Sequence, residues 1–164
     1  MKNASNKTIW IILLIILFFL LSCASTQEKK TESRDGDFYV KRGDAYDKKG
    51  QYDQAISDYT KALEINPRLA EAHNGLAWLL AAAKEPGIRN GKKAVKHALI
   101  ACELSDWKNP NYLDTLAAAY ARVGDFSNAI KWQEKALGFP EFARFKEPQQ
   151  RLNLYRQRKA WPPD

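Results

Sequence analysis

An internal repeat constrains the fold of this chain more than any other feature of its sequence. The segment AYDKKGQYDQAISDYTKAL returns in related form as AYARVGDFSNAIKWQEKAL. The matched pairs, each 74 positions apart, are Tyr46 with Tyr120, Gly50 with Gly124, Tyr52 with Phe126, Ala55 with Ala129 and Ala62 with Ala136. A middle copy lies between them, in which Ala77 and Leu80 follow Gly43 and Tyr46 by 34 positions. Repetition at this period is typical of stacked units that cannot bury an apolar face alone.

Local signals predict that each unit is a pair of helices. Asn66-Pro67 and Asn109-Pro110 each place a capping side chain before a proline, which is a common way to begin a helix. Gly50 lies where a helix would end, and glycine is favoured at such positions. The predicted helices cover about 37–48, 52–65, 69–83, 91–104, 111–123 and 127–137.

The alternation of small and aromatic residues at this period resembles the tetratricopeptide repeat (TPR), over about 37–137. Gly43, Ala77 and Ala117 stand where TPR helices cross closely, although Gln133 stands where the family has an aromatic residue. The resemblance implies an all-α fold, an α-solenoid of three TPR helix pairs with a C-terminal capping helix. The implied divisions are a TPR domain over 37–139, with repeats at about 36–69, 70–109 and 110–139, and a capping helix and tail over 140–164.

The C-terminal tail carries no further repeat but has a helical pattern. Pro148 suits a first helical position, and Leu152 and Tyr155 lie three residues apart on a face expected to point inward. We interpret this segment as a helix that covers the last repeat. The alternative is a contact with anionic lipid or another partner through the basic and aromatic side chains of Arg156, Arg158, Lys159 and Trp161.

The N-terminus has the pattern of a secretion signal. A short positive segment precedes 13 apolar residues, Ile9 to Leu21, which is a typical length for a signal core. The sequence LLSC that ends at Cys23 resembles the lipobox of bacterial lipoproteins. This resemblance implies a signal peptide over 1–22, lipid attachment at Cys23, and a flexible tether over 23–36.

Acylation of Cys23 would anchor the protein to a membrane, because two or more acyl chains make attachment stable. Ala24, in place of aspartate, favours the outer membrane facing the periplasm under enterobacterial-type sorting. The alternative is an uncleaved anchor, since Thr8 to Ala24 just reaches the lower length limit of a membrane-spanning helix. If Cys23 is acylated, the remaining cysteine, Cys102, lacks an intrachain partner.

The sequence offers no pattern of catalytic chemistry. It contains no phosphate-binding glycine loop and no nucleophile motif, and His73 and His97 lie 24 residues apart without metal-ligand spacing. Cys102 is expected to be a small core residue. A net charge of +7 falls short of a nucleic-acid-binding composition with clustered arginines. We therefore expect no catalytic residue, metal, cofactor, nucleic acid or small-molecule substrate.

The TPR resemblance implies that the first helix of each pair lines a concave groove. The implied groove residues are Asp37, Val40, Asp44 and Asp47, then Glu71, Asn74, Trp78 and Ala81, then Asn111, Asp114, Ala118 and Ala121. Val40 and Asp44 replace the lysine and asparagine with which some TPR domains hold a terminal carboxylate, so that clamp is not expected. We expect the acids, with Asn74 and Trp78, to bind an extended basic segment that carries one apolar anchor.

These features together predict a lipid-anchored protein-interaction scaffold of the bacterial cell envelope that assists assembly of an envelope complex. The first alternative is a TPR adaptor held by an uncleaved N-terminal transmembrane helix. The second is a lipid- or glycan-binding module that uses the basic tail.

Overall fold

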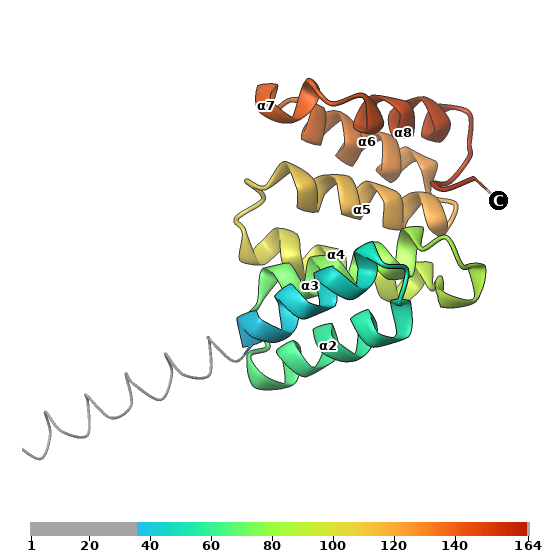
Figure 1. Ribbon diagram of the computed structural model, residues 1–164. Coiled ribbons are helices and arrows are strands. Elements are labelled where there is room, and N and C mark those ends of the chain that lie inside the picture. The colour runs from blue at the N-terminus through green and yellow to red at the C-terminus, as the bar shows by residue number, and fades with distance from the viewer. Residues whose placement is uncertain (1–35, 164) are drawn as a thin grey trace, which may run out of the picture.

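The structure, a computed structural model, describes residues 36–163 of the chain (Figure 1). The predicted signal peptide, Cys23 and nearly all of the predicted tether lie outside these residues. Every regular element within 36–163 is helical. None of the helices in this range has the length and apolar character that crossing a membrane requires.

The helices follow the predicted boundaries closely. The first described helix covers 36–48, and the others are α2 (Tyr52–Ile65), α3 (Ala70–Ala82), α4 (Gly91–Leu104), α5 (Pro110–Arg122), α6 (Phe126–Leu137), α7 (Pro140–Ala143) and α8 (Lys146–Arg156). A 3-10 turn, η1 (Pro86–Ile88), occupies the long loop of the middle repeat. The C-terminal helix begins two residues before Pro148, so the prediction of proline at its first position was wrong.

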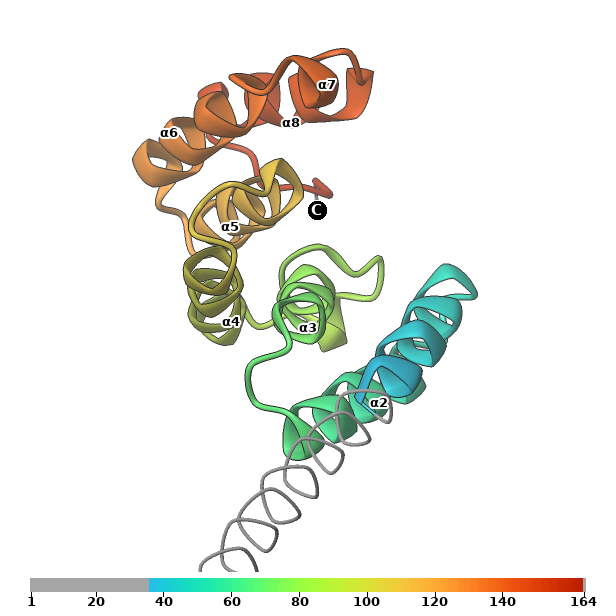
Figure 2. The ribbon, with the colours of Figure 1, turned by 90° about the vertical axis from the view of Figure 1, so that its left-hand side faces the viewer.

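The helices form an arc of antiparallel pairs, which confirms the predicted all-α solenoid. Figure 2 shows α3 and α5 toward the inner side of the arc, and the C-terminal segment on that side as well. Helix α8 packs against α6 and covers the last pair, as expected of a capping helix. Its inward residues Leu152 and Tyr155 are buried.

Capping side chains fix where three of the helices begin. Asn90, Asn109 and Asp125 accept hydrogen bonds from the backbone amides at the starts of α4, α5 and α6. Asn66 does not cap α3 in this way. Its side chain accepts from the Arg68 amide in the preceding turn, and the N-cap position of α3 is Leu69.

Small residues let the helices approach closely. Tyr59 of α2 is 1% exposed, and its ring lies against Gly43 of the first helix and Gly75 of α3. A Cβ atom at Gly43 would come within 2.8 Å of this ring, and one at Gly75 within 2.5 Å. Because neither glycine has a side chain, the Tyr59 ring fits between their two helices and packs against both.

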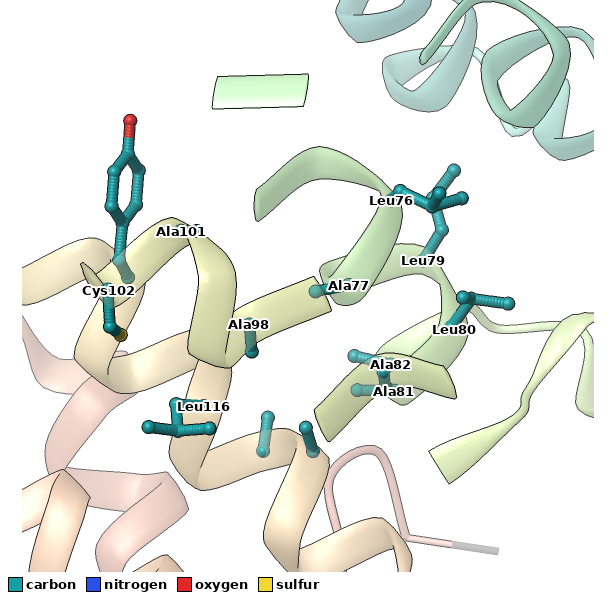
Figure 3. Close-up of a cluster of buried hydrophobic side chains, with 14 of the residues drawn as sticks. Leu76, Ala77, Leu79, Leu80, Ala81, Ala82, Ala98, Ala101, Cys102 and Leu116 are labelled. Atoms are coloured by element: carbon teal, nitrogen blue, oxygen red, sulfur yellow. The ribbon is translucent and has the colours of Figure 1, made fainter. Parts of the chain in front are cut away.

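The core continues through the middle of the stack as interleaved leucine and alanine side chains. Leu79 of α3, Ala98 of α4 and Leu116 of α5 are fully or almost fully buried (Figure 3). Cys102 lies among them, as predicted for a small core residue. Each large apolar side chain buried in this way contributes about 1.5–3 kcal/mol.

Candidate functional site

A hollow on the inner side of the arc is lined by helices of two repeats and by the capping helix. Asn74 and Trp78 stand one turn apart on α3, Asn111 and Thr115 come from α5, and Arg151 comes from α8. The hollow has a volume of about 260 Å³. The side-chain oxygen of Asn74 is buried and has no hydrogen-bond partner among the residues the structure describes. Leaving such an oxygen without a partner costs about 1–3 kcal/mol.

A buried ion pair forms the floor of this hollow. Arg151 donates two hydrogen bonds to Asp114, 2.9 Å to Oδ1 and 2.8 Å to Oδ2. The Gln133 amide donates a third, 2.6 Å to Oδ1. Burial raises the pKa of the Asp114 carboxyl, and Arg151 and Gln133 oppose that rise.

The predicted role of Asp114 is therefore corrected. Only 5% of the residue is exposed, and both carboxylate oxygens are bonded to other parts of the same chain. It cannot offer a free negative charge to a partner, because Arg151 already balances that charge. Gln133 departs from the expected aromatic residue because its amide completes this network in the core.

A second hollow, of about 480 Å³, lies beside the first. It is bounded by the end of the first helix, the start of α2, the end of α3 and the C-terminal segment. Trp78, Tyr52 and Trp161 supply aromatic surface, and lysines stand around it. The pKa of the Asp47 carboxyl in its wall is raised mainly by burial and further by Asp44, while Lys48 opposes the rise.

The C-terminal segment reaches this hollow by folding back along the inner side of the arc. The Arg122 side chain donates to the carbonyl oxygens of Trp161 and Pro162, each at 2.9 Å, and to that of Ala81 on α3. The Arg151 guanidinium lies 5.5 Å from the Trp78 ring centroid and 5.8 Å from that of Trp161. These contacts fix Trp161 as part of the groove wall.

Comparison with known proteins now identifies the repeats. The tetratricopeptide repeat family profile matches residues 36–69 and again residues 110–140. These two segments are tetratricopeptide repeats. Among solved structures, the first TPR of Spaghetti (RPAP3) bound to the HSP90 peptide SRMEEVD is similar, with a TM-score of 0.63 and 21% sequence identity. The similarity covers 76% of this chain and 93% of that chain. The search of curated proteins found no match.

The TPR register places the predicted groove residues unevenly. Asn74 and Trp78 line the inner hollows, and Asp47 lies beside them. Val40 is only 3% exposed and belongs to the core, so its prediction as a groove contact was wrong. Glu71 lines a separate hollow at the starts of the first helix, α3 and α5, together with Asp37 and cationic side chains. The predicted acids therefore do not form one continuous surface.

Two histidines that are 24 residues apart in the sequence are in contact in the stack. The Nδ1 atoms of His73 on α3 and His97 on α4 lie 3.0 Å from each other, and His73 Nε2 lies 3.1 Å from the Pro67 carbonyl oxygen. Burial lowers the pKa of both imidazoles. Within residues 36–163 no three metal-ligating side chains gather around them. Burial also raises the pKa of the Cys102 thiol to about 12, which makes it a poor nucleophile.

Two groove features were missed by sequence reasoning. The repeat pattern predicts which residues lie on the first helices, but Arg151 and Trp161 lie beyond the last repeat. The only available signal was the aromatic and basic composition of the tail, which suggested a contact without showing where it would occur. TPR modules are protein-interaction scaffolds.

Proposed function

We propose that this protein is a membrane-anchored TPR scaffold of the bacterial cell envelope that holds an extended segment of a partner protein in its concave groove. The observation that carries the proposal is the inner hollow beside Asn74 and Trp78. An amide side chain that lines the groove suits the backbone of an extended segment, and an adjacent indole suits an apolar side chain.

Membrane anchoring rests on the LLSC sequence at Cys23 and the apolar run before it. The test is the intact mass of protein extracted from membranes. A processed lipoprotein has a mass that corresponds to an acylated chain beginning at Cys23, and Cys23→Ala is expected to leave an uncleaved precursor without lipid. A full-length unmodified mass for the wild type would instead support the alternative of an uncleaved N-terminal helix.

Location in the outer membrane, facing the periplasm, rests on Ala24 after the modified cysteine. Separation of inner and outer membranes on a density gradient tests this part of the proposal. Ala24→Asp is expected to move the protein toward the inner-membrane fraction if the sorting rule applies. An unchanged distribution would contradict it.

Partner binding is tested by capture from envelope extract with the full-length protein, followed by mass spectrometry. We expect binding to one short segment at about micromolar affinity, because ordering a flexible peptide offsets much of its contact energy. Trp78→Ala should lose the partners that the wild type captures, whereas Lys131→Ala on the opposite face of the stack should retain them. Identical partners for all three proteins would contradict binding in the groove.

The charge of the partner is a separate question. The predicted basic segment depended on four acids acting together, but Asp114 is neutralised by Arg151 and Glu71 lies in another hollow. Binding of a basic segment stays a prediction only for the part of the groove formed by the first helix, which carries Asp44 and Asp47. Comparing acidic and basic peptides of otherwise equal composition decides this point.

A further inference from the structure

Two hollows border the returning C-terminal segment. The hollow beside Trp78, described above, borders Trp161 and Pro162. Another hollow, also of about 480 Å³, borders Arg158 to Ala160 and Pro163 of the segment together with the end of α5 and the start of α6. The chain reverses after α8 at Arg158, whose φ is 58°, and the returning segment begins at this turn.

The charges around these hollows are strongly unbalanced. Of the described residues that line them, one is acidic, Asp47. The cationic ones besides Arg122, whose donors are bonded within the chain, are Lys48, Lys49 and Lys84 at the first hollow and Arg158 and Lys159 at the second. A concave region with charge of one sign raises the rate at which oppositely charged segments arrive and selects against like-charged ones.

The segment also supplies a rigid aromatic surface. Trp161 is partly buried, packs against both buried clusters, and has its carbonyl held by Arg122. The Arg151 guanidinium lies near the rings of both Trp161 and Trp78 of α3. Tryptophans in partly enclosed positions are frequent centres of binding energy. Because Trp161 is already fixed, little ordering cost remains on this side of an interface.

We propose that this basic, aromatic surface docks an acidic segment of a partner protein, with one apolar or aromatic side chain seated against Trp78 and Trp161. The inference rests on the proposed function and deepens it by naming the chemistry of the partner. The surface uses the ends of the helices and the tail, and it does not involve Val40 or Asp44, the positions where other TPR domains carry a clamp.

A peptide segment fits these observations better than a lipid surface. The cations surround concave hollows, whereas a bilayer would meet a flat or protruding surface. Insertion of Trp161 into lipid would also require breaking its hydrogen bond to Arg122 and its contact with Arg151. Binding to a membrane is therefore the competing outcome that the experiment must distinguish.

The test uses the full-length protein in detergent and three fluorescent peptides. The first has a central tryptophan with three glutamates on each side, the second replaces the glutamates with lysines, and the third replaces the tryptophan with alanine. We expect the first peptide to bind at about 10 μM and each of the others at least about tenfold more weakly. Equal affinities for acidic and basic peptides, or binding of none, would overturn the proposal.

Matched variants then locate the binding surface. Lys48→Glu/Lys84→Glu should weaken the acidic peptide by at least about tenfold, and Trp161→Ala should do the same. Lys146→Glu makes the same type of charge change at the far end of α8 and should leave affinity within about twofold. Circular dichroism melts show whether each variant is folded. If folded lysine variants bind the acidic peptide as the wild type does, the surface is not its docking site.

Two further arms separate the sources of failure. A larger sedimented fraction of Cys23→Ala protein with anionic than with neutral vesicles, abolished by Lys48→Glu/Lys84→Glu and without peptide binding, would assign the surface to the membrane and overturn the proposal. Partner capture from envelope extract that is lost in Trp78→Ala but unaffected by the lysine changes would also overturn it. In that case the proposed scaffold function would still stand, because a partner would bind the groove by other contacts.

Discussion

Tyr59 illustrates how single residues set the spacing of this stack. Its ring occupies the space left by Gly43 and Gly75 on two other helices, and its hydroxyl donates to Asp44 at 2.7 Å. Burial and the hydrogen bond to Asp44 raise the pKa of this phenol. A large side chain thus packs where two neighbouring helices have none, which brings three backbones close together.

Gly75→Ala is expected to destabilise the protein. Alanine would normally stabilise a helix by about 0.5–1 kcal/mol relative to glycine. Here its Cβ would lie 2.5 Å from Cζ of Tyr59, and overpacking of this kind costs typically about 1–3 kcal/mol. Urea denaturation measures the balance. Gly87→Ala is the control, because no atom lies within 4 Å of its Cβ position. A Gly75→Ala protein as stable as the wild type would contradict this packing.

The His73–His97 contact predicts a pH dependence of stability. The Pro67 carbonyl oxygen can only accept, so His73 donates to it from Nε2–H, and the Nδ1 of a neutral His73 accepts from His97 Nδ1–H. Burial lowers the pKa of both in the folded state, with Lys93 and Lys96 adding to the effect at His97. The unfolded chain therefore binds more protons below about pH 6.5, and stability falls as the pH decreases through that region.

Urea midpoints measured between pH 7.5 and 5.5 test this expectation. The free energy of unfolding should decrease toward pH 5.5 in the wild type. His97→Gln removes one titrating ring and should give a smaller decrease over the same range. A decrease of equal size in both proteins would show that other groups cause the pH dependence.

At the scale of elements, the Asp114 network connects three helices. Asp114 belongs to α5, Gln133 to α6 and Arg151 to α8. The same Arg151 faces Trp78 of α3, so the capping helix contacts both the last repeat and the groove wall. The cap is therefore held by a specific polar contact as well as by the buried side chains of Leu152 and Tyr155.

Arg151→Ala is expected to destabilise the protein by about 3–5 kcal/mol, because it leaves the Asp114 carboxylate buried without its counterion. Arg156→Ala on the same helix is the control. Arg156 pairs with Glu134 at 2.9 Å, but both side chains are about half exposed, so little stability should be lost. Chemical denaturation compares the two variants. Similar losses would indicate that the Asp114 pair contributes no more than a surface pair.

Across the whole molecule, the repeats form one arc whose inner side holds the groove and whose last helices close its end. A repeat stack needs terminal elements that cover its exposed face. Helices α7 and α8 and the returning segment serve this purpose, since Phe142, Tyr155 and Trp161 pack on the two core clusters. Closing the stack and completing the groove are thus done by the same part of the chain.

A chain that ends at Gly138 is therefore expected to lose cooperative folding. It would expose the face of α6 that α8 covers and would leave Asp114 without Arg151. Thermal melting followed by circular dichroism, with size-exclusion chromatography for aggregation, tests this. A chain that ends at Pro163 is the control and should melt as the full chain does. Unchanged melting of the shorter chain would show that the cap is dispensable.

The sequence by itself determined the helix pairs, their order and the solenoid. They follow from local features: the 34-residue period, the cap at Asn109, and the glycines between paired helices at Gly50 and Gly124. The two glycines have φ angles of 71° and 82°, which explains why glycine occurs there. Local backbone geometry depends on local residues, so these features could be predicted from the pattern.

Only the tertiary structure decided which groove residues are free to bind. Asp114 carries the same sequence signal as an exposed acid, yet Arg151, 37 residues further on, neutralises it. Likewise the return of Trp161 to α3 depends on Arg122, 39 positions earlier in the chain. A local pattern gives the face of a helix on which a side chain lies. The exposure of that side chain and the balance of its charge depend on which distant segments pack against the face. The packing of those segments is decided only when the whole chain folds.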